Sequence, residues 1–379
     1  MKILFTTLLL LISFNFINAL AERKDSTKYS ISATYNQGIV LFDSFYNMYL
    51  INDYAKSGEI SLIRKRFQSN VWEKDFNDLE TGISLWFSTF GNKDIFGNGI
   101  VLKTFANFRL FQLGKLNARY QISIGPAYVT KLYDVNKNYF NFNFGTRLNT
   151  YASIGFIINY PVTKSISLTG NWMFHHISNG SFKKPNNGVN ILNFGLGLKY
   201  DLYHEPQYLP VYNGNVQRRY AQSLYNLREI MVTSGLGINQ AYIVNPQRYL
   251  SGSFSVTHLW FTNKVKAYGL GLDFIHIGGA PFIFSDFNDG EINKENTFSN
   301  NLFLGCYGTM ESHLGTTAPY LTVGYYIYHK TKPTSPVYAR LGLRQKIIGN
   351  LSAHFSIKTS PFTSEFMEFG LAYRFRYKV

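Results

Sequence analysis

The sequence predicts an all-β protein whose antiparallel strands close into a transmembrane β-barrel. Aromatic residues make up 17% of the 379 residues, and there are 31 glycines but only 11 prolines. Beyond the N-terminal segment, no window contains about 18 uninterrupted apolar residues, the length that a membrane-spanning helix requires. Short runs of alternating apolar and polar residues recur instead, which is typical of transmembrane barrels. A soluble, secreted β-sandwich would have a similar composition, so composition alone leaves both classes open.

The N-terminus has the features of a secretory signal peptide. Lys2 precedes an apolar run from Ile3 to about Phe16, and Ala19-Leu20-Ala21 matches the A-x-A pattern of a cleavage site. The apolar run is too short for a comfortable transmembrane helix. We therefore expect residues 1–21 to be removed after export.

Alternating runs at roughly even spacing follow, separated by polar turns. Successive side chains of a strand point to opposite faces, so alternation predicts strands that each carry one apolar face. The predicted strands cover residues 29–37, 57–68, 79–90, 99–112, 115–130, 149–160, 165–178, 189–202, 226–241, 249–262, 264–277, 298–311, 317–329, 337–346, 350–359 and 365–377. The last one alternates bulky apolar residues with small or basic ones, as expected for a strand with one face towards lipid.

One break divides this series of strands. Residues 203–225 contain Pro206 and Pro210 and predict an irregular connection. The predicted organisation is a signal peptide at 1–21, a first barrel segment at 22–202, the connection at 203–225 and C-terminal barrel strands at 226–379. Because unpaired strand edges are costly in hydrocarbon, the strands should close on themselves. We expect one barrel of about twelve to sixteen strands, an even number, with two packed eight-stranded barrels as the alternative.

The cysteine content and the charge restrict the partners. Cys306 is the only cysteine, which excludes an intramolecular disulfide and a zinc site built from cysteines. The formal net charge of +15 comes from basic residues that are scattered along the chain. Nucleic acid is therefore an unexpected partner for this exported chain, whereas phosphorylated lipid or an anionic membrane surface suits the charge.

The stretch from His176 to Asn190 carries the strongest functional signal. In the predicted strand 165–178, His176 and Ser178 continue the face formed by Ile166, Leu168, Trp172 and Phe174. Asn190 shares a face with the apolar residues of the next predicted strand. A hairpin between the two strands would bring His176, Ser178 and Asn190 together at the rim of one apolar surface. His175 falls on the opposite face and is expected to point into the lumen.

These residue types suit nucleophilic catalysis. A serine hydroxyl becomes a good nucleophile when a neighbouring imidazole takes its proton. The imidazole needs a third group that holds its tautomer and orientation, usually a carboxylate, although an amide can serve. Asn179 and Asn186 could donate hydrogen bonds to the developing oxyanion. A histidine and a serine two residues apart also occur often by chance, so the spacing alone leaves catalysis open.

The segment FHHISNGSFKKPNNGVN, residues 174–190, resembles the active-site hairpin of the lipid A 3-O-deacylase (PagL-like) family. The resemblance is strongest with the longer, acyloxyacyl-hydrolase-type members of Bacteroidetes. It is best over about residues 100–202 and continues in the C-terminal strands, at residues 338–342 and 365–370. It implies an outer-membrane barrel of a Gram-negative bacterium with a Ser-His-acid triad that faces lipid. His176 would be the base and Ser178 the nucleophile, with Asn179 and Asn186 near the oxyanion hole.

One position departs from this family. The acid of the family is a glutamate, and Asn190 occupies its position. The same arrangement also resembles the outer-membrane phospholipases A, whose triad is Ser-His-Asn with the same spacing from serine to asparagine. The residues that surround calcium in those phospholipases are not evident in Ser181–Pro185. Lys183 and Lys184 could contact phosphates of lipid A or of an anionic phospholipid, or simply be solvated.

The sequence thus leaves three functions to compare. The first is an outer-membrane serine esterase that removes an ester-linked acyl chain from lipid A, with no cofactor and no metal. The second is an outer-membrane phospholipase A, for which calcium is a possible cofactor. The third is a barrel without enzymatic activity, either a pore or a structural protein, which would need neither His176 nor Ser178.

Overall fold

The computed structural model describes residues 27–41, 48–66, 78–202, 227–243, 246–262, 265–284, 295–361 and 363–378. Within these ranges it contains sixteen β-strands and two short helices. The strands of the first half are β1 (Thr27–Leu41), β2 (Ala55–Arg66), β3 (Glu80–Thr89), β4 (Asn98–Leu113), β5 (Leu116–Val129), β6 (Leu148–Pro161), β7 (Ile166–Ser178) and β8 (Val189–Asp201). The elements of the second half are β9 (Leu227–Gln240), β10 (Arg248–Phe261), β11 (Lys266–His276), α5 (Ala280–Ile283), η1 (Ser299–Asn301), β12 (Leu302–Ser312), β13 (Thr317–His329), β14 (Val337–Ile348), β15 (Leu351–Thr359) and β16 (Ser364–Lys378).

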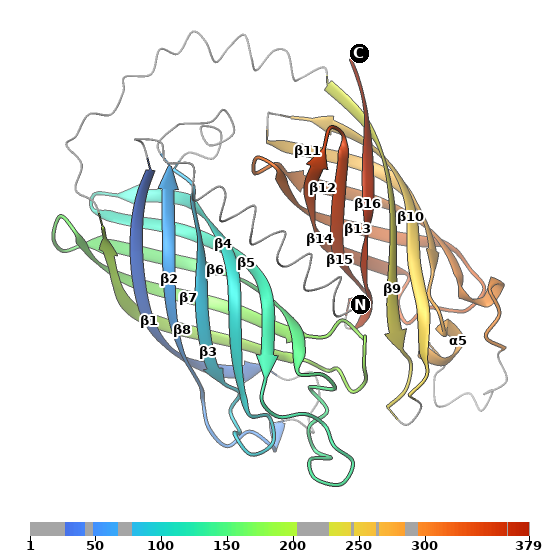
Figure 1. Ribbon diagram of the computed structural model, residues 1–379, viewed down its shortest axis with the longest axis horizontal. Helices are drawn as coiled ribbons and strands as arrows, with labels where there is room; N and C mark the ends of the chain where they lie inside the picture. Colours follow the sequence, from blue (N-terminus) through green and yellow to red (C-terminus); the bar gives the residue numbers. More distant parts are fainter. Residues whose placement is uncertain are drawn as a thin grey trace.

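The strands form two closed antiparallel barrels that stand beside each other (Figure 1). In the first barrel β8 returns to β1, with Tyr200 opposite Ile31. In the second barrel β16 returns to β9, with Phe369 opposite Leu236. Closure pairs the edge strands of both sheets, as a membrane-spanning sheet requires. The all-β, antiparallel barrel class is confirmed, and of the two predicted architectures the structure has the one with two eight-stranded barrels.

Two predicted segments lie outside the described residues. These are the signal peptide at 1–21 and the irregular connection at 203–225, so both stay predictions together with the domain boundaries that they define. No helix within the described ranges is long and apolar enough to cross a membrane.

One predicted strand begins too early. The alternation placed its start at residue 298, but β12 begins at Leu302 because residues 299–301 form the 3-10 turn η1. Side chains hold this turn: the Thr297 hydroxyl accepts a hydrogen bond from the N–H of Asn300, and the amide of Asn301 donates to Asn296. Such local hydrogen bonds compete with strand pairing, and the alternation of apolar and polar residues carries no information about them.

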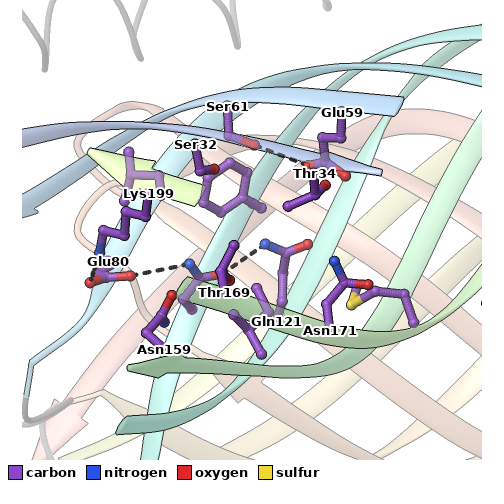
Figure 2. A pocket seen from close by; sticks show the side chains of 15 residues that line it. Ser32, Thr34, Glu59, Ser61, Glu80, Gln121, Asn159, Thr169, Asn171 and Lys199 are labelled. Atoms are coloured by element: carbon purple, nitrogen blue, oxygen red, sulfur yellow. Dashed lines mark hydrogen bonds and ion pairs between the residues drawn. The ribbon is translucent and has the colours of Figure 1, made fainter. Parts of the chain in front are cut away.

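The two faces of the barrel wall differ as the alternation predicts. On β7, Trp172 and Phe174 are exposed on the outer wall, whereas Met173 and His175 are buried in the lumen. Inside the first barrel, Glu80 accepts a hydrogen bond from Lys199 at 2.9 Å, and both point towards the same interior space (Figure 2). The interior of an eight-stranded barrel is just wide enough for side chains to fill it. This packing argues against an open pore through the first barrel.

A hydrophobic cluster fills one end of the first barrel, directly behind the end of the β7–β8 hairpin. Its buried members on these two strands are Ile177, Val189 and Ile191. Trp86 from β3 stacks on His175, with ring centroids 4.9 Å apart, and the Tyr151 hydroxyl lies 2.6 Å from Nδ1 of His175. The side chains on the lumenal face therefore fix this end of the hairpin from behind, and the opposite face carries the candidate site.

Candidate active site

Three neighbouring strands place the candidate site on the outer wall of the first barrel. His176 on β7 lies directly opposite Asn190 on β8 and opposite Ala152 on β6. Ser178, the last residue of β7, lies opposite Thr150. Since His176 and Ser178 are two residues apart on a strand, they share a face, and antiparallel pairing brings Asn190 to the same face.

The three side chains form one hydrogen-bonded chain. Nε2 of His176 lies 2.8 Å from Oγ of Ser178, and Nδ1 of His176 lies 2.7 Å from Oδ1 of Asn190. An amide oxygen only accepts hydrogen bonds, so Nδ1 carries the ring proton and donates a hydrogen bond to Oδ1 of Asn190. In the neutral imidazole Nε2 then carries no proton, so it accepts the hydrogen bond from the hydroxyl of Ser178 and can act as its base. The geometry fits a nucleophile, its general base and a group that orients the base.

A glycine closes the hairpin tightly over this chain. Gly188 has φ of 73°. A Cβ atom added there would lie 2.7 Å from the carbonyl oxygen of Ile177, 3.1 Å from Cβ of Ser178 and 3.3 Å from Cε1 of His176. The N–H of Gly188 donates to the carbonyl of Asn143 at 3.1 Å, which ties the hairpin to the β5–β6 loop. The close approach and the left-handed backbone both require glycine here.

The two asparagines expected near the oxyanion hole hold the loop after Ser178 together. The side chain of Asn179 donates to the carbonyl of Lys183 at 2.8 Å and accepts from the N–H of Lys183 at 3.3 Å. The N–H of Asn179 donates to Oδ1 of Asn186 at 2.7 Å. The amide nitrogen of Asn186 makes a longer contact, 3.4 Å, with Oγ of Ser364 from the second barrel. Their role towards an oxyanion stays a prediction.

The loop after Ser178 holds two further candidate donors that the sequence analysis did not name, the N–H groups of Gly180 and Ser181. Gly180 and Ser181 have φ of 60° and 65° and follow Ser178 closely in the loop. Within the part of the chain that the structure describes, their N–H groups donate to no protein acceptor. The pair Asn179-Gly180 is the turn signal that could have pointed to them.

The lysines of the loop are placed differently from each other. Lys183 is exposed. Lys184 is partly buried, with Nζ 3.4 Å from Oγ of Ser181, and burial lowers the pKa of its ammonium group. Neither position tests a contact with lipid phosphate. Among the described residues, no group of three or more His, Cys, Asp or Glu side chains is arranged to hold a metal ion.

The second barrel also reaches the loop, a contact that no pattern in the sequence indicates. Gln240 from the end of β9 and Ser364 and Met367 from the start of β16 contact residues 180–186. These residues lie between 50 and 190 positions away along the chain, and no local pattern links them to the hairpin.

Comparisons with known protein families agree with the resemblance seen in the hairpin sequence. The family model described as lipid A 3-O-deacylase (PagL) matches residues 62–199. The model described as acyloxyacyl hydrolase, C-terminal domain, matches residues 228–377. The two matches run from within β2 to near the end of β8 in the first barrel and cover nearly all of the second. No curated protein matches the chain.

Solved structures of other barrels were also compared. Neisserial surface protein A is 14% identical with a TM-score of 0.30, over 45% of this chain and 96% of its own. CdiB from Acinetobacter baumannii is 10% identical with a TM-score of 0.19, over 93% of this chain and 60% of its own. A mutant porin of Rh. blastica is 8% identical with a TM-score of 0.17, over 92% of this chain and all of its own, 100%. Identities and TM-scores this low carry no argument about function. The two family models show that the chain belongs to the PagL-like family.

Proposed function

We propose that this protein is an outer-membrane serine esterase that removes an ester-linked acyl chain from lipid A. The hydrogen-bonded chain from Ser178 through His176 to Asn190, on the outer wall of a barrel, carries this proposal. The family match supports ester hydrolysis and an outer-membrane location, and a lipid A deacylase is the activity in its description. Cleavage of a signal peptide stays a prediction.

The geometry supports an acyl-enzyme mechanism. Oγ of Ser178 attacks the ester carbonyl carbon while Nε2 of His176 takes the hydroxyl proton. The tetrahedral intermediate collapses, and His176 returns this proton to the departing alcohol oxygen of lipid A. A water molecule then gives a proton to Nε2 and attacks the acyl carbonyl carbon. When this second intermediate collapses, His176 returns the proton to Oγ of Ser178, which releases the fatty acid and restores the serine hydroxyl. The N–H groups of Gly180 and Ser181 and the amide of Asn186 are the candidate donors to the oxyanion.

The outer wall offers a path for the acyl chain. Phe156, Trp172 and Phe194 lie side by side on β6, β7 and β8, with Trp172 5.8 Å from Phe156 and 6.0 Å from Phe194 between ring centroids. They line an apolar groove that faces lipid. Trp172 lies four residues before His176 on β7, about 13 Å along the strand. An acyl chain in this groove would reach Ser178 without leaving the hydrocarbon.

A phospholipase A activity is the second candidate, and one observation favours it. The group that orients His176 is the neutral amide of Asn190, as in the triad of the phospholipases that the hairpin resembles. The lipid A reading is preferred because both family models that match the chain describe lipid A deacylase or acyloxyacyl hydrolase domains. A barrel without activity remains the third reading.

Mass spectrometry of lipid A and phospholipids tests the proposal. Cells that express the wild type should lose one acyl chain from lipid A, and Ser178→Ala and His176→Ala should both abolish this loss to a similar extent, because the residues act as a unit. Ser234→Ala and His258→Ala replace an exposed serine and an exposed histidine of the second barrel and serve as matched controls. Heat-modifiable migration in electrophoresis checks that every variant is folded.

The possible outcomes separate the three readings. Loss of a phospholipid acyl chain in place of the lipid A chain, dependent on Ser178, favours the phospholipase. Activity that persists in Ser178→Ala ends the serine esterase proposal. No change in either lipid class, for the wild type as for the variants, favours the barrel without activity.

A further inference from the structure

We infer that the C-terminal barrel completes the serine site of the first barrel, with Gln240 and Met367 as positioning residues for the loop that follows Ser178. The inference rests on the proposed function. The loop between β7 and β8, residues 179–188, lies against the ends of β9 and β16 where the two barrels meet (Figure 1).

Ser181 is the first point of attachment. Its Oγ donates to the carbonyl oxygen of Ser364 at 2.5 Å and lies 3.1 Å from Oγ of Ser364. The carbonyl of Ser181 accepts a hydrogen bond from the N–H of Gln240 at 2.9 Å. Although Ser181 lies in a loop at the end of a barrel, it is only 2% exposed. Two strands of the second barrel thus hold one loop residue three positions after the candidate nucleophile.

Gln240 provides a second attachment through its side chain. Its Oε1 accepts a hydrogen bond from the N–H of Lys184 at 3.2 Å, while its Nε2 donates to the carbonyl of Tyr242 at 2.6 Å. The side chain is therefore oriented by its own barrel and presents an acceptor to the loop. The guanidinium group of Arg248, at the start of β10, stacks over the ring of Phe182 with a distance of 4.4 Å to the centroid.

Met367 provides the third attachment, through contacts with Gly180 and with Thr150. A Cβ atom added to Gly180 would lie 2.1 Å from Cγ of Met367, so the methionine lies directly on this glycine. The sulfur of Met367 accepts a hydrogen bond from Oγ1 of Thr150 at 3.4 Å. Thr150 lies opposite Ser178 in the β6–β7 pairing. Met367 therefore touches both the loop after Ser178 and the strand beside it.

The backbone of the loop explains why such support matters. Ser181 has φ of 65°, a left-handed conformation that is strained for a residue other than glycine and persists only when its surroundings hold it. The Oγ and carbonyl of Ser181, which fix this conformation, are bound by the second barrel. A shift of about 1 Å in a catalytic group costs roughly 100-fold in rate. On its other side the loop is held by the β5–β6 loop, through the carbonyls of Phe142 and Asn143, so the second barrel carries part of the support.

The first experiment compares variants of the full-length protein, purified in detergent. Gln240→Ala and Met367→Ala remove the two side-chain attachments separately and together, whereas Met367→Leu keeps the packing. Met310→Ala is the matched control, since Met310 is an exposed methionine on the outer wall of the same barrel. Both kcat and KM are measured on lipid A, together with the rate at which a fluorophosphonate labels Ser178.

The double variant should lose about 10- to 100-fold in kcat and in labelling rate, with KM changed less than about twofold. Met367→Leu should keep most of the activity, and Met310→Ala should behave as the wild type. An unchanged kcat in the double variant overturns the inference, and so does an equal loss in Met310→Ala. A loss that appears in KM alone also overturns it, because the second barrel would then bind substrate and not position the serine loop.

A disulfide test separates this inference from the proposed function. In a Cys306→Ser background, Ser181→Cys combined with Ser364→Cys should form a disulfide between the barrels on oxidation, and a protease cut between the barrels should then release no fragment without reductant. This readout needs no enzymatic activity. If the wild type neither hydrolyses lipid nor reacts with fluorophosphonate, but the cysteine pair of the variant cross-links, the proposed function is refuted and the contact between the barrels stands. If the wild type is active and the cysteine pair of the variant fails to cross-link, the contact is refuted.

Discussion

Replacement of Asn190 by aspartate should raise the turnover of this site. The substitution keeps the length of the side chain, so a carboxylate oxygen takes the place of Oδ1, 2.7 Å from Nδ1 of His176. During the reaction His176 becomes a cation, and a carboxylate stabilises that cation more strongly than an amide does. Asn190→Glu restores the residue type of the family but adds a methylene group at a distance that is already short. We therefore expect a smaller gain from glutamate than from aspartate.

The magnitude follows from this hydrogen bond. A bond to a charged group contributes about 1.5 to 3 kcal/mol, against about 1 kcal/mol for a neutral pair. The difference of about 0.5 to 2 kcal/mol corresponds to roughly a 2- to 30-fold rise in kcat. Coulomb attraction between two charges 4 Å apart, about 4 kcal/mol at an effective dielectric constant of about 20, sets an upper limit on this gain. Removal of water from the new carboxylate offsets part of it, because Asn190 is partly buried.

The assay compares kcat of the purified wild type, Asn190→Asp, Asn190→Glu and Asn190→Ala on lipid A and on a phospholipid, with and without calcium. Asn187→Asp is the matched control. Asn187 is exposed in the same loop, so this substitution introduces the same charge away from His176. Asn190→Ala should lower kcat, because the imidazole loses the group that holds its tautomer. A kcat for Asn190→Asp at or below that of the wild type, in a folded protein, refutes the reasoning. A loss confined to calcium-dependent phospholipid cleavage would favour the phospholipase.

Three further predictions concern the wall, the hairpin and the loop. Single cysteines at positions 171–174, in a Cys306→Ser background, should react alternately with a membrane-soluble maleimide, at 172 and 174 only; labelling without alternation would remove the strand assignment. Gly188→Ala should reduce kcat by about 100-fold or more, because the new Cβ would displace Ser178 and His176, whereas Gly114→Ala, at φ of 55° with no atom within 4 Å, should keep full activity. Lys183→Gln should raise KM up to about fivefold for phosphorylated lipid A and leave it unchanged for dephosphorylated lipid A, since exposed ion pairs contribute less than about 1 kcal/mol.

The fold class could be predicted from the sequence because barrel walls impose a period of two. The predicted strand at 165–178 agrees with β7 to within one residue. The predicted faces agree as well, because Trp172 and Phe174 face lipid and Met173 and His175 face the lumen. The number of barrels could not be predicted in this way. Alternation describes each strand by itself, whereas closure depends on which distant strand pairs with β1 or β9. A strand of one sixteen-stranded barrel and a strand of an eight-stranded barrel alternate alike.

The candidate site was predictable where it is local. His176 and Ser178 share a face because they are two residues apart, and the short loop brings Asn190 opposite His176. The hydrogen-bond partners of Asn179 and Asn186 were not predictable, because they depend on the path of the loop backbone. The contacts of Gln240 and Met367 were not predictable either, since they arise only when two separately closed barrels meet.

The meeting of the two barrels also bears on the residue that departs from the family. Ser178 is 3% exposed, in a corner formed by the hairpin, the β5–β6 loop and the loop contacts of the second barrel. A carboxylate in such surroundings loses hydration, which costs several kcal/mol unless hydrogen bonds replace the water. An amide keeps the tautomer of His176 in place without that cost. Asn190 thus gives up some stabilisation of the transition state, which the expected rise of kcat in Asn190→Asp measures. In return it avoids a burial cost that a carboxylate would place on the stability of the fold, and this cost grows as the second barrel excludes more water from the corner.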